Sequence, residues 1–393
     1  MAGPLEGLKI LDFTTLLPGP YATTLLADLG AEVLRVASPS RPDLANLFPP
    51  FLPGRDISAA AAYLGRGKRS IFLNLKNPAA APVVKRLLGT YDVVIEQFRP
   101  GVMAKLGLGY ADLSQDRPAL IYCSLTGYGQ TGPLAARAGH DINYLARSGL
   151  MSYSGKKGSG PSLTGMQIAD VAAGSNNAVI GILAAVIHRG RTGQGQHIDV
   201  SMTDGVFAFN ALAGAAALVD GKEPQREGEL INGGALYDFY ETQDGQYLSV
   251  GAMEPQFFGA FCRAVGCPEL APGGFCPANV AETKIMVRRM IRTKTREEWV
   301  EILADFDACV EPVLSLQEAL EDPHVKARGL VVDVELAGGG TVRQIACPIR
   351  FSATPPVCGR TGGTPGADTK KILQEIGYAK REIAAFRTGG LFD

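Results

Sequence analysis

The first forty residues contain two short apolar runs with a helical segment between them. The run from Leu8 to Phe13 predicts a strand, and Ala31 to Ala37 predicts a second strand. Between them, Tyr21 to Leu29 has apolar residues at helical spacing, and Gly30 is typical of the residue that follows a helix. The pattern therefore predicts one β-α-β unit.

The same alternation continues to residue 201. A helix is predicted from Pro78 to Leu88, and a helical region from Ile142 to Arg189 is interrupted between Ser154 and Gly165. Further strands are predicted at 92–96, 119–125 and 197–201. Because strands that alternate with helices favour parallel pairing, the expected fold class is α/β, with a Rossmann-like parallel sheet.

The second half of the chain has a different pattern. Residues 220–232 are polar and charged and are interpreted as a linker, and 237–250 alternate like a hairpin about Asp244-Gly245. Helical segments follow at 256–265 and 296–306, and the tail from Val331 is strand-like before a charged helix at 370–386. This mixture predicts a smaller α+β domain.

Composition narrows the function classes. The 393 residues are 46% hydrophobic and 20% charged, which is typical of a globular chain of two or three domains. The net charge of -1 excludes the electrostatic signature of a general nucleic-acid binder, but it leaves open a local basic patch for a phosphorylated small molecule. The N-terminal residues do not resemble a secretory signal, and the apolar stretch 171–187 is too short and too polar to be expected to span a membrane.

The seven cysteines lack the paired spacing of a zinc site or a disulfide framework, which favours a reducing cytoplasm and no metal centre. No Gly-rich dinucleotide or P-loop motif follows the first strand, so nucleotide-dependent oxidoreductases and NTPases are disfavoured. Basic residues gather near the ends of the predicted strands. They are expected more often on a solvated face than in an anion site, and they are Arg66, Lys68, Arg69, Lys76, Arg99 and Lys105.

Three residues are candidates for chemistry. His140 stands where a Gly-rich loop enters a helix, a place where free backbone N–H groups can hold an oxyanion. Asp170 lies in a stretch of small apolar residues, where a carboxylate is costly unless it is paired or used. Glu254 follows a strand and precedes Pro255. The alternatives are structural: a capping or packing role for His140, and helix capping for both acids.

Five stretches of the chain resemble a known family. They lie at 4–36, 95–110, 125–146, 196–205 and 247–258, and they resemble family III CoA-transferases, specifically the α-methylacyl-CoA racemase branch. The likeness extends over nearly the whole chain. The combination of GHDINY at 139–144 with EPQF at 254–257 points to racemases rather than transferases.

The resemblance implies a role for each candidate. His140 matches the racemase base, Asp170 the second acid/base, and Glu254 the glutamate that supports the histidine; in transferases the residue that matches Asp170 is the nucleophile. One departure is Ser38, where the family often has a basic residue that Arg35 or Arg41 would have to replace. The implied coenzyme A contacts are Arg35, Leu73, Asn74, Leu75, Lys76, Gln97, Phe98, Arg99, Lys105, Gly139, Asp141, Ile142, Asn143 and Tyr144.

The expected reaction is racemisation of a 2-methylacyl-CoA thioester by proton transfer through an enolate. Inverting the α-carbon needs a base on one face and an acid on the other, which suits the unlike pair His140 and Asp170. Coenzyme A enters as part of the substrate, and no metal or redox cofactor is required. The alternatives are a CoA-transferase with Asp170 as nucleophile, and a CoA-thioester binding protein without turnover.

The resemblance also implies an architecture. It predicts an interlocked homodimer in which Glu254 of one subunit reaches His140 of the other. Apolar residues such as Leu150, Met151 and Met166 suggest an adaptable acyl surface without identifying the acyl group. The predicted ranges are 1–204 for the first part of the large domain, 205–232 for a linker, 233–325 for the small domain and 326–393 for the return to the large domain.

Overall fold

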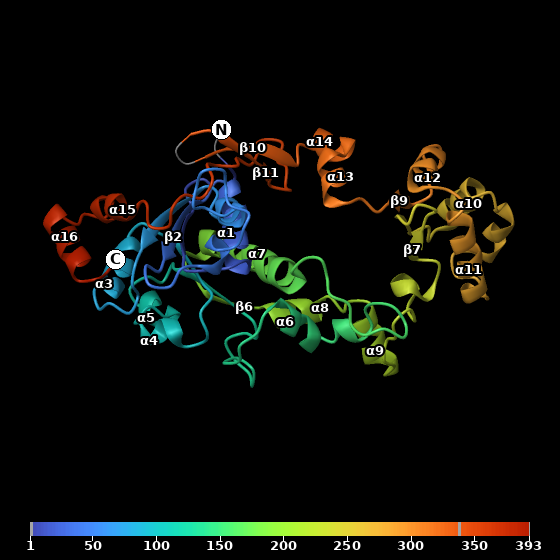
Figure 1. Ribbon diagram of the computed structural model, residues 1–393. Coiled ribbons are helices and arrows are strands. Elements are labelled where there is room, and N and C mark those ends of the chain that lie inside the picture. Colours follow the sequence, from blue (N-terminus) through green and yellow to red (C-terminus); the bar gives the residue numbers. More distant parts are fainter. Residues whose placement is uncertain (1–2, 337–338, 393) are drawn as a thin grey trace. The chain divides into compact units, whose positions relative to one another are not determined.

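The computed structural model describes residues 3–336 and 339–392 (Figure 1). Contacts divide the chain into two compact units, which are described separately. Unit 1 contains the described residues of 1–148, 164–208 and 324–393, and unit 2 contains 149–163 and 209–323.

Unit 1 is built on a six-stranded sheet with the order β3-β2-β1-β4-β5-β6. Every neighbouring pair is parallel, which confirms the α/β class predicted from the alternation. The central strands β1, β4 and β5 are almost entirely buried, as expected when helices cover both faces of a sheet. The strands are β1 Lys9–Asp12, β2 Glu32–Ala37, β3 Lys68–Phe72, β4 Val93–Glu96, β5 Ile121–Thr126 and β6 His197–Ser201.

Helices and one antiparallel ribbon complete unit 1. Helix α1 begins at Pro18, a residue suited to the first turn, and Gly30 follows it with φ +102°. The helices are α1 Pro18–Asp28, α2 Ala59–Leu64, α3 Ala80–Leu87, α4 Val102–Lys105, α5 Tyr110–Ser114, α6 Asp141–Arg147, the π-helix η3 Ala169–Ser175, α7 Asn176–Thr192, α8 Met202–Ala208, α15 Thr369–Glu375 and α16 Lys380–Thr388, with a short 3₁₀ turn η1 at Leu44–Asn46. The ribbon pairs β10 Val331–Glu335 with β11 Thr341–Ile345, and α14 Pro323–Ala327 precedes it.

Strand β3 was not predicted, because it begins with two basic residues. Lys68 is nevertheless buried: its Nζ donates to the Pro20 carbonyl at 2.8 Å and lies 3.5 Å from the Asp12 carboxylate. Arg66 is also fully buried, and its guanidinium binds both oxygens of Asp28. The expectation of a solvated face is therefore wrong for these two cations, since each has a buried acidic partner.

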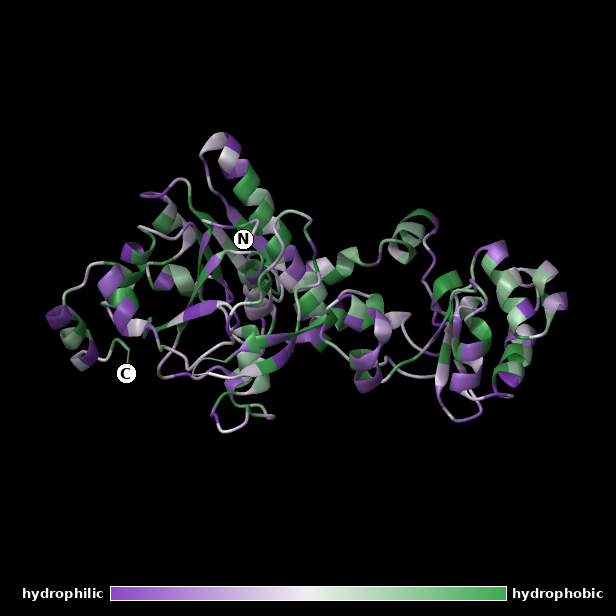
Figure 2. Ribbon diagram, turned by 90° about the horizontal axis from the view of Figure 1, so that it is seen from above, coloured by the Kyte–Doolittle hydropathy of each residue, from purple (hydrophilic) through white to green (hydrophobic). Residues whose placement is uncertain are grey.

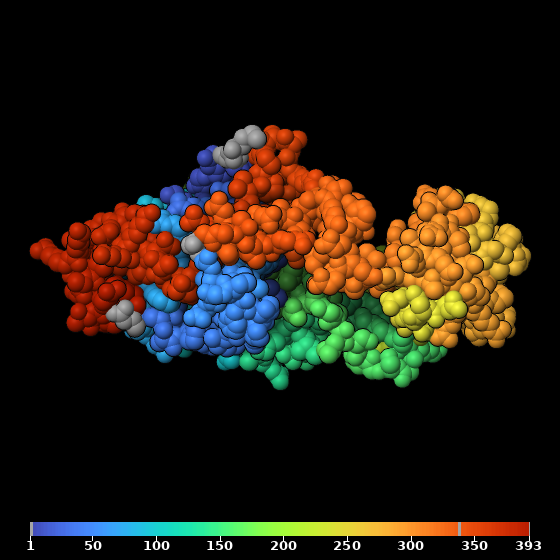
Figure 3. Space-filling model, turned by 45° about the horizontal axis from the view of Figure 1, so that its top comes forward, coloured from blue at the N-terminus to red at the C-terminus, as the bar shows by residue number. Residues whose placement is uncertain are grey.

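The C-terminal segment returns to unit 1. The Asn74 N–H donates to the Leu391 carbonyl at 2.6 Å, and the apolar side chains of α15 and α16 join the core cluster that contains Leu73. Figure 3 shows this segment in red against the blue N-terminal residues, and Figure 2 shows that its last helices carry many hydrophilic residues. The single helix expected at 370–386 is two helices, because Gly377 between them has φ +88°.

Unit 2 has its own core and a three-stranded antiparallel sheet. The hairpin expected about Asp244-Gly245 is present, and the buried Trp299 donates its indole N–H to the Ile291 carbonyl at 2.7 Å. The strands are β7 Asp238–Glu241, β8 Tyr247–Val250 and β9 Val310–Pro312. The helices are η2 Leu150–Ser152, α9 Ala213–Asp220, η4 Leu230–Gly234, α10 Pro255–Ala264, η5 Pro268–Gly273, α11 Val280–Ile291, α12 Arg296–Leu303 and α13 Leu316–Glu321.

Two predicted ranges differ from the structure. Residues 149–163, which the sequence placed with 1–204, belong to unit 2, because the Arg226 guanidinium donates to the carbonyls of Met151, Ser154 and Ser159. The range 205–232, expected as a linker, contains helix α9.

The helical stretch Ala169–Thr192 is longer than the apolar segment identified in the sequence. By length and composition it is sufficient to cross a membrane. In the structure, α7 packs against α1 and β5, and Ala178, Ile182 and Ala185 are fully buried. Its burial within unit 1 accounts for the apolar composition of one face of the helix.

Candidate active site

The direction in which successive strands are added to the sheet reverses between β1 and β4. The first of the predicted coenzyme A contacts lies at this point. The chain runs from β1 to β2 on one side and from β4 to β5 on the other, so the loops after β1 and β4 border the position at the carboxyl edge where sheets of this kind usually bind ligands. The Gln97 side-chain oxygen accepts the Gly19 N–H at 3.2 Å and joins the two loops. A Cβ atom on Gly19 would lie 2.2 Å from Thr14 Cβ, which explains why this turn requires glycine.

The turn after β1 is organised by a buried carboxylate instead of a Gly-rich phosphate loop. Asp12 accepts the Thr14 N–H at 2.8 Å and the hydroxyls of Thr14 and Thr23 at 2.5 Å each. Lys68 lies beside it, and burial lowers the pKa of its ammonium to about 8. These interactions hold the turn after β1 against α1 and β3.

The segment after β3 combines buried and exposed candidates. Leu73 is fully buried in the core, so its side chain supports the loop, and Asn74 binds the C-terminal residues through its N–H and its side-chain amide. Lys76 is exposed on the same loop. Of the three candidates that follow β4, Phe98 packs against the core, whereas Arg99 and Lys105 are exposed. Three cations are therefore available at the surface of these loops.

Arg35 has an intramolecular partner. Its guanidinium forms an ion pair with Asp43, whose carboxylate also accepts the Leu16 N–H, and the Arg35 Nε is buried without a hydrogen bond. Arg41 is exposed near Ser38, and its N–H donates to the Ser38 hydroxyl at 3.2 Å. Of the two arginines expected to compensate for Ser38, Arg41 is the one with an exposed side chain.

His140 is the residue that precedes helix α6. Its N–H donates to the Asn143 side chain at 3.0 Å, and its carbonyl accepts the N–H groups of Asn143 and Tyr144. The imidazole forms no capping hydrogen bond and is exposed. The His140 side chain therefore does not fill the capping role considered as the alternative, and the Asn143 side chain accepts the N–H of His140 itself. The N–H groups left for an oxyanion at this helix start are those of Asp141 and Ile142.

Tyr144 fixes the loop that carries His140. Its hydroxyl donates to the Gly139 carbonyl at 2.5 Å. A Cβ atom on Gly127 or Gly139 would lie 2.3 Å or 2.6 Å from the Tyr144 ring, so both positions require glycine. The predicted contacts Gly139 and Tyr144 therefore act on each other, and they set the direction in which the loop enters α6.

Asp170 lies in the first turn of η3 and is half-buried. Its N–H and that of Ala169 both donate to the Asp141 carboxylate, at 3.0 Å and 2.6 Å. Burial, together with the negative charge of Asp141, raises the pKa of Asp170 to about 6, and the opposite influence of His140 lowers it. The structure thus brings Asp170 into one cluster with His140 and Asp141, and the helix-capping role belongs to Asp141.

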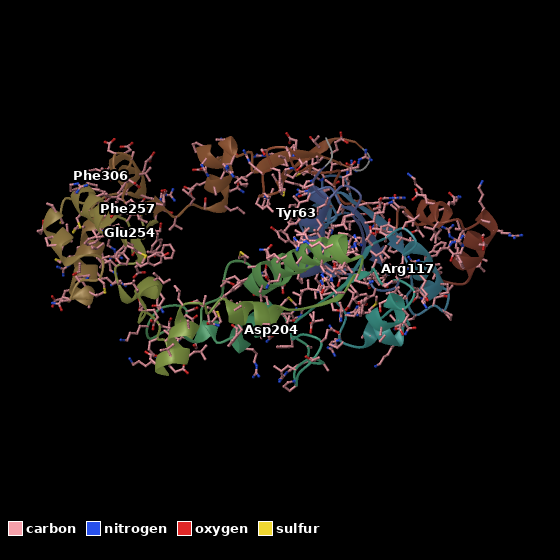
Figure 4. All side chains as sticks on the ribbon, turned by 180° about the vertical axis from the view of Figure 1, so that it is seen from behind. Tyr63, Arg117, Asp204, Glu254, Phe257 and Phe306 are labelled. Atoms are coloured by element: carbon pink, nitrogen blue, oxygen red, sulfur yellow. The ribbon has the colours of Figure 1, made fainter. Side chains whose placement is uncertain are left out.

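Glu254 belongs to unit 2 (Figure 4). It precedes helix α10, is exposed, and forms no side-chain capping hydrogen bond. Phe257 and Phe306, from the same unit, pack against its core. The capping alternative is not realised, and the partnership of Glu254 with His140 stays a prediction.

Two acids near these loops were not identified as functional from the sequence. The side chain of Asp141 was expected only among coenzyme A contacts, although its place beside His140 was a signal. Glu96, at the end of β4, is buried and accepts the Phe98 N–H at 2.8 Å, and burial raises the pKa of its carboxyl to about 7.

Comparisons with known proteins agree with this geometry. The sequence pattern of CoA-transferase family III matches residues 5–369. This chain belongs to CoA-transferase family III. It is 36% identical to the alpha-methylacyl-CoA racemase of Homo sapiens over 382 residues, covering 96% of this chain and 95% of the relative. It is also 35% identical to the succinate–glutarate CoA-transferase of Agrobacterium fabrum over 389 residues, covering 96% and 97%.

A solved structure has the same fold. The crystal structure of a CAIB/BAIF family protein from Brucella suis superposes with a TM-score of 0.84 at 31% identity, covering 96% of this chain and all of that chain. The resemblance found in the sequence motifs is thereby confirmed at the level of the family. Because racemase and transferase relatives differ by only one percentage point in identity, the reaction has to be argued from the site.

Proposed function

We propose that this protein is a racemase of 2-methylacyl-CoA thioesters that moves a proton between the two faces of the α-carbon. One observation carries the proposal: an exposed imidazole and a half-buried carboxyl whose pKa is about 6 belong to one cluster, held by Asp141. A carboxyl with this pKa is protonated in a useful fraction near neutral pH, which a proton donor requires.

The proposed reaction has two steps. His140 removes the α-proton from the S face, and the thioester oxygen becomes an enolate that the N–H groups of Asp141 and Ile142 stabilise. The protonated Asp170 then delivers its proton to the opposite face, and the roles exchange in the reverse direction. Because a single residue would return the proton to the face it left, both residues are needed.

Coenzyme A is proposed to bind at the carboxyl edge of the sheet as part of the substrate. The loops that the Gly19–Gln97 hydrogen bond joins border the usual ligand position in such sheets. The exposed cations Arg41, Lys76, Arg99 and Lys105 supply positive charge for its phosphates. The proposed chemistry requires no metal or redox cofactor.

The second candidate is a CoA-transferase with Asp170 as nucleophile. The identity to the Agrobacterium fabrum transferase favours it. A pKa of about 6 is compatible with this role too, because a carboxyl with this value is mostly ionised at neutral pH. A binding protein without turnover is the third candidate, and it predicts unchanged CoA binding when His140 is removed, with no chemistry in the parent protein.

We also propose a homodimer that acts in the cytoplasm. Helix α7 exposes Ile180 and Ile187 at 62% and 57%, apolar surface that a second subunit would cover. Glu254 is exposed and unused as a cap, which suits a role toward His140 of a partner subunit.

The deciding experiment is solvent exchange at the α-carbon. A panel of 2-methylacyl-CoA thioesters in D₂O is followed for epimerisation, deuterium incorporation and exchange of CoA onto free acids. Racemisation with deuterium incorporation supports the proposal. Racemisation without incorporation contradicts it, whereas CoA exchange together with hydroxylamine trapping of an acyl group at Asp170 establishes the transferase.

A further inference from the structure

The carboxylate of Asp141 spans two helices. Asp141 belongs to the first turn of α6, yet its Oδ1 accepts the N–H groups of Ala169 and Asp170 at 2.6 Å and 3.0 Å in the first turn of η3. The residue that precedes η3, Ile168, has no side chain able to cap the helix. The first N–H groups of η3 have no acceptor within the helix, and they donate instead to Asp141, which lies 28 and 29 positions earlier in the chain.

This contact ties the backbone of Asp170 to the start of α6, where His140 stands. Asp141 directly follows His140, and it bonds to the backbone of Asp170 itself. A shift of η3 away from α6 would break both hydrogen bonds. Ser175 holds the other end of the same turn, because its hydroxyl donates to the carbonyls of Pro18 and Asp170 at 2.6 Å and 3.0 Å.

The same carboxylate acts on Asp170 by its charge. The groups that face the Asp170 carboxyl are Asp141 and His140 at the start of α6 and the phenol of Tyr144 within it. The phenol is neutral at neutral pH, since burial raises the pKa of Tyr144 to about 12. Asp141 is therefore the negative charge that opposes ionisation of Asp170, and His140, when protonated, favours it.

We infer that Asp141 is a positioning residue for proton transfer, whose carboxylate both anchors the Asp170 backbone and keeps the Asp170 side chain available as a proton donor. The inference rests on the proposed racemase function for its consequence in catalysis. The inference goes beyond the expected coenzyme A contact, because it gives the Asp141 side chain a role toward Asp170. A simple helix cap would need the two hydrogen bonds and no charge.

Substitution by asparagine separates the two roles. Asp141→Asn keeps an oxygen that accepts the N–H groups of η3 and removes the negative charge, whereas Asp141→Ala removes both. Asp112→Asn is the matched control, because Asp112 also accepts a backbone N–H, from Gly109 at 3.1 Å, at the start of a different helix of unit 1.

The direct test is an NMR titration of protein labelled with ¹³C at the aspartate carboxyl carbons. The resonance absent from Asp170→Asn identifies Asp170. The expected pKa in the parent protein is about 6; it moves down in Asp141→Asn and stays in place in Asp112→Asn. An unchanged Asp170 titration in Asp141→Asn would overturn the inference, whether or not Asp141→Ala folds.

Activity supplies the second readout. In the direction in which Asp170 acts as the acid, the rate falls as pH rises through the pKa of Asp170. Asp141→Asn lowers this pKa, so the falling limb of the pH profile should move to lower pH. KM should show no matching change. If the NMR shift is found and the parent protein incorporates no deuterium from D₂O with any thioester, the proposed function fails while the role of Asp141 toward Asp170 stands. If the NMR shift is found and the pH limb does not move, the role in catalysis is rejected.

Discussion

Gly19 donates its N–H to the side-chain oxygen of Gln97 at 3.2 Å, beside the carboxyl ends of β1 and β4. This bond joins the turn that begins α1 to the loop that follows β4. Both loops border the position where parallel sheets of this order bind ligands. Coenzyme A affinity is therefore expected to depend on Gln97, a predicted contact, and on the Gly19 backbone that it holds.

Gln97→Ala is predicted to weaken coenzyme A binding about fivefold, since Gln97 is an implied coenzyme A contact and a neutral hydrogen bond to the ligand contributes about 1 kcal/mol. Isothermal titration calorimetry with CoA measures the change. Gln115→Ala, at an exposed position after α5, serves as the control and should bind CoA like the parent protein. Equal affinities of Gln97→Ala and the parent would show that the bond does not organise the site.

His140→Ala and Asp170→Asn are each predicted to reduce epimerisation by about 100-fold or more, the usual effect of losing a general acid or base. The CoA affinity should stay within about threefold, because neither side chain holds the cofactor moiety in the proposed mechanism. Exchange from one enantiomer in D₂O provides a finer measurement. Each variant should still exchange the proton on the face that its remaining group serves, and loss of CoA binding in both variants would contradict the assigned roles.

Arg66→Met is predicted to destabilise unit 1 by about 3 to 5 kcal/mol, because it leaves the buried carboxylate of Asp28 without its partner. The loss should be partly recovered in the double variant Arg66→Met with Asp28→Leu. Urea unfolding measures each free energy. Arg69→Met is the comparison, since Arg69 is part-exposed and its ion pairs should contribute less than about 1 kcal/mol.

The free energy of unfolding is predicted to fall as pH rises through the pKa of Glu96. Burial raises the pKa of its carboxyl from 4.5 to about 7 in the folded protein. The folded state therefore holds a proton that the unfolded chain has released, and its contribution is complete below about pH 4.5 and lost as pH passes 7. A shift of this size corresponds to a loss on the order of 3 kcal/mol.

Urea unfolding at pH 5 and pH 8 tests this expectation. The difference in unfolding free energy between the two pH values should be smaller in Glu96→Gln than in the parent protein, because glutamine does not ionise. Glu297→Gln, at an exposed position of α12, should leave the difference unchanged. A parent-like difference in Glu96→Gln would show that other groups cause the pH dependence.

The sequence predicted five of the six strands in the parallel sheet of unit 1. The strands β1, β2, β4, β5 and β6 were found because their apolar runs are local signals. Strand β3 was missed because Lys68 made it look exposed. Its burial depends on Asp12 and Thr23, which are distant in the sequence and adjacent only in the folded sheet.

In the candidate site, too, local motifs were predictable from the sequence and contacts between distant residues were not. The five stretches that carry the resemblance, which include those around His140 and Glu254, were recognisable because each is short and contiguous, and they were sufficient to predict the family that the comparisons confirmed. The interaction of Asp141 with Asp170 and the pKa that follows from it were not predictable. They depend on the packing of η3 against α6.

The sequence by itself determined most strands of the parallel sheet, the family and the residue types available for chemistry, because these follow from periodicity and short motifs. Only the tertiary structure decided which charges are buried, which acid caps which helix and which carboxyl holds its proton near neutral pH. Burial and charge–charge interactions depend on distances between residues far apart in the chain, and folding sets those distances.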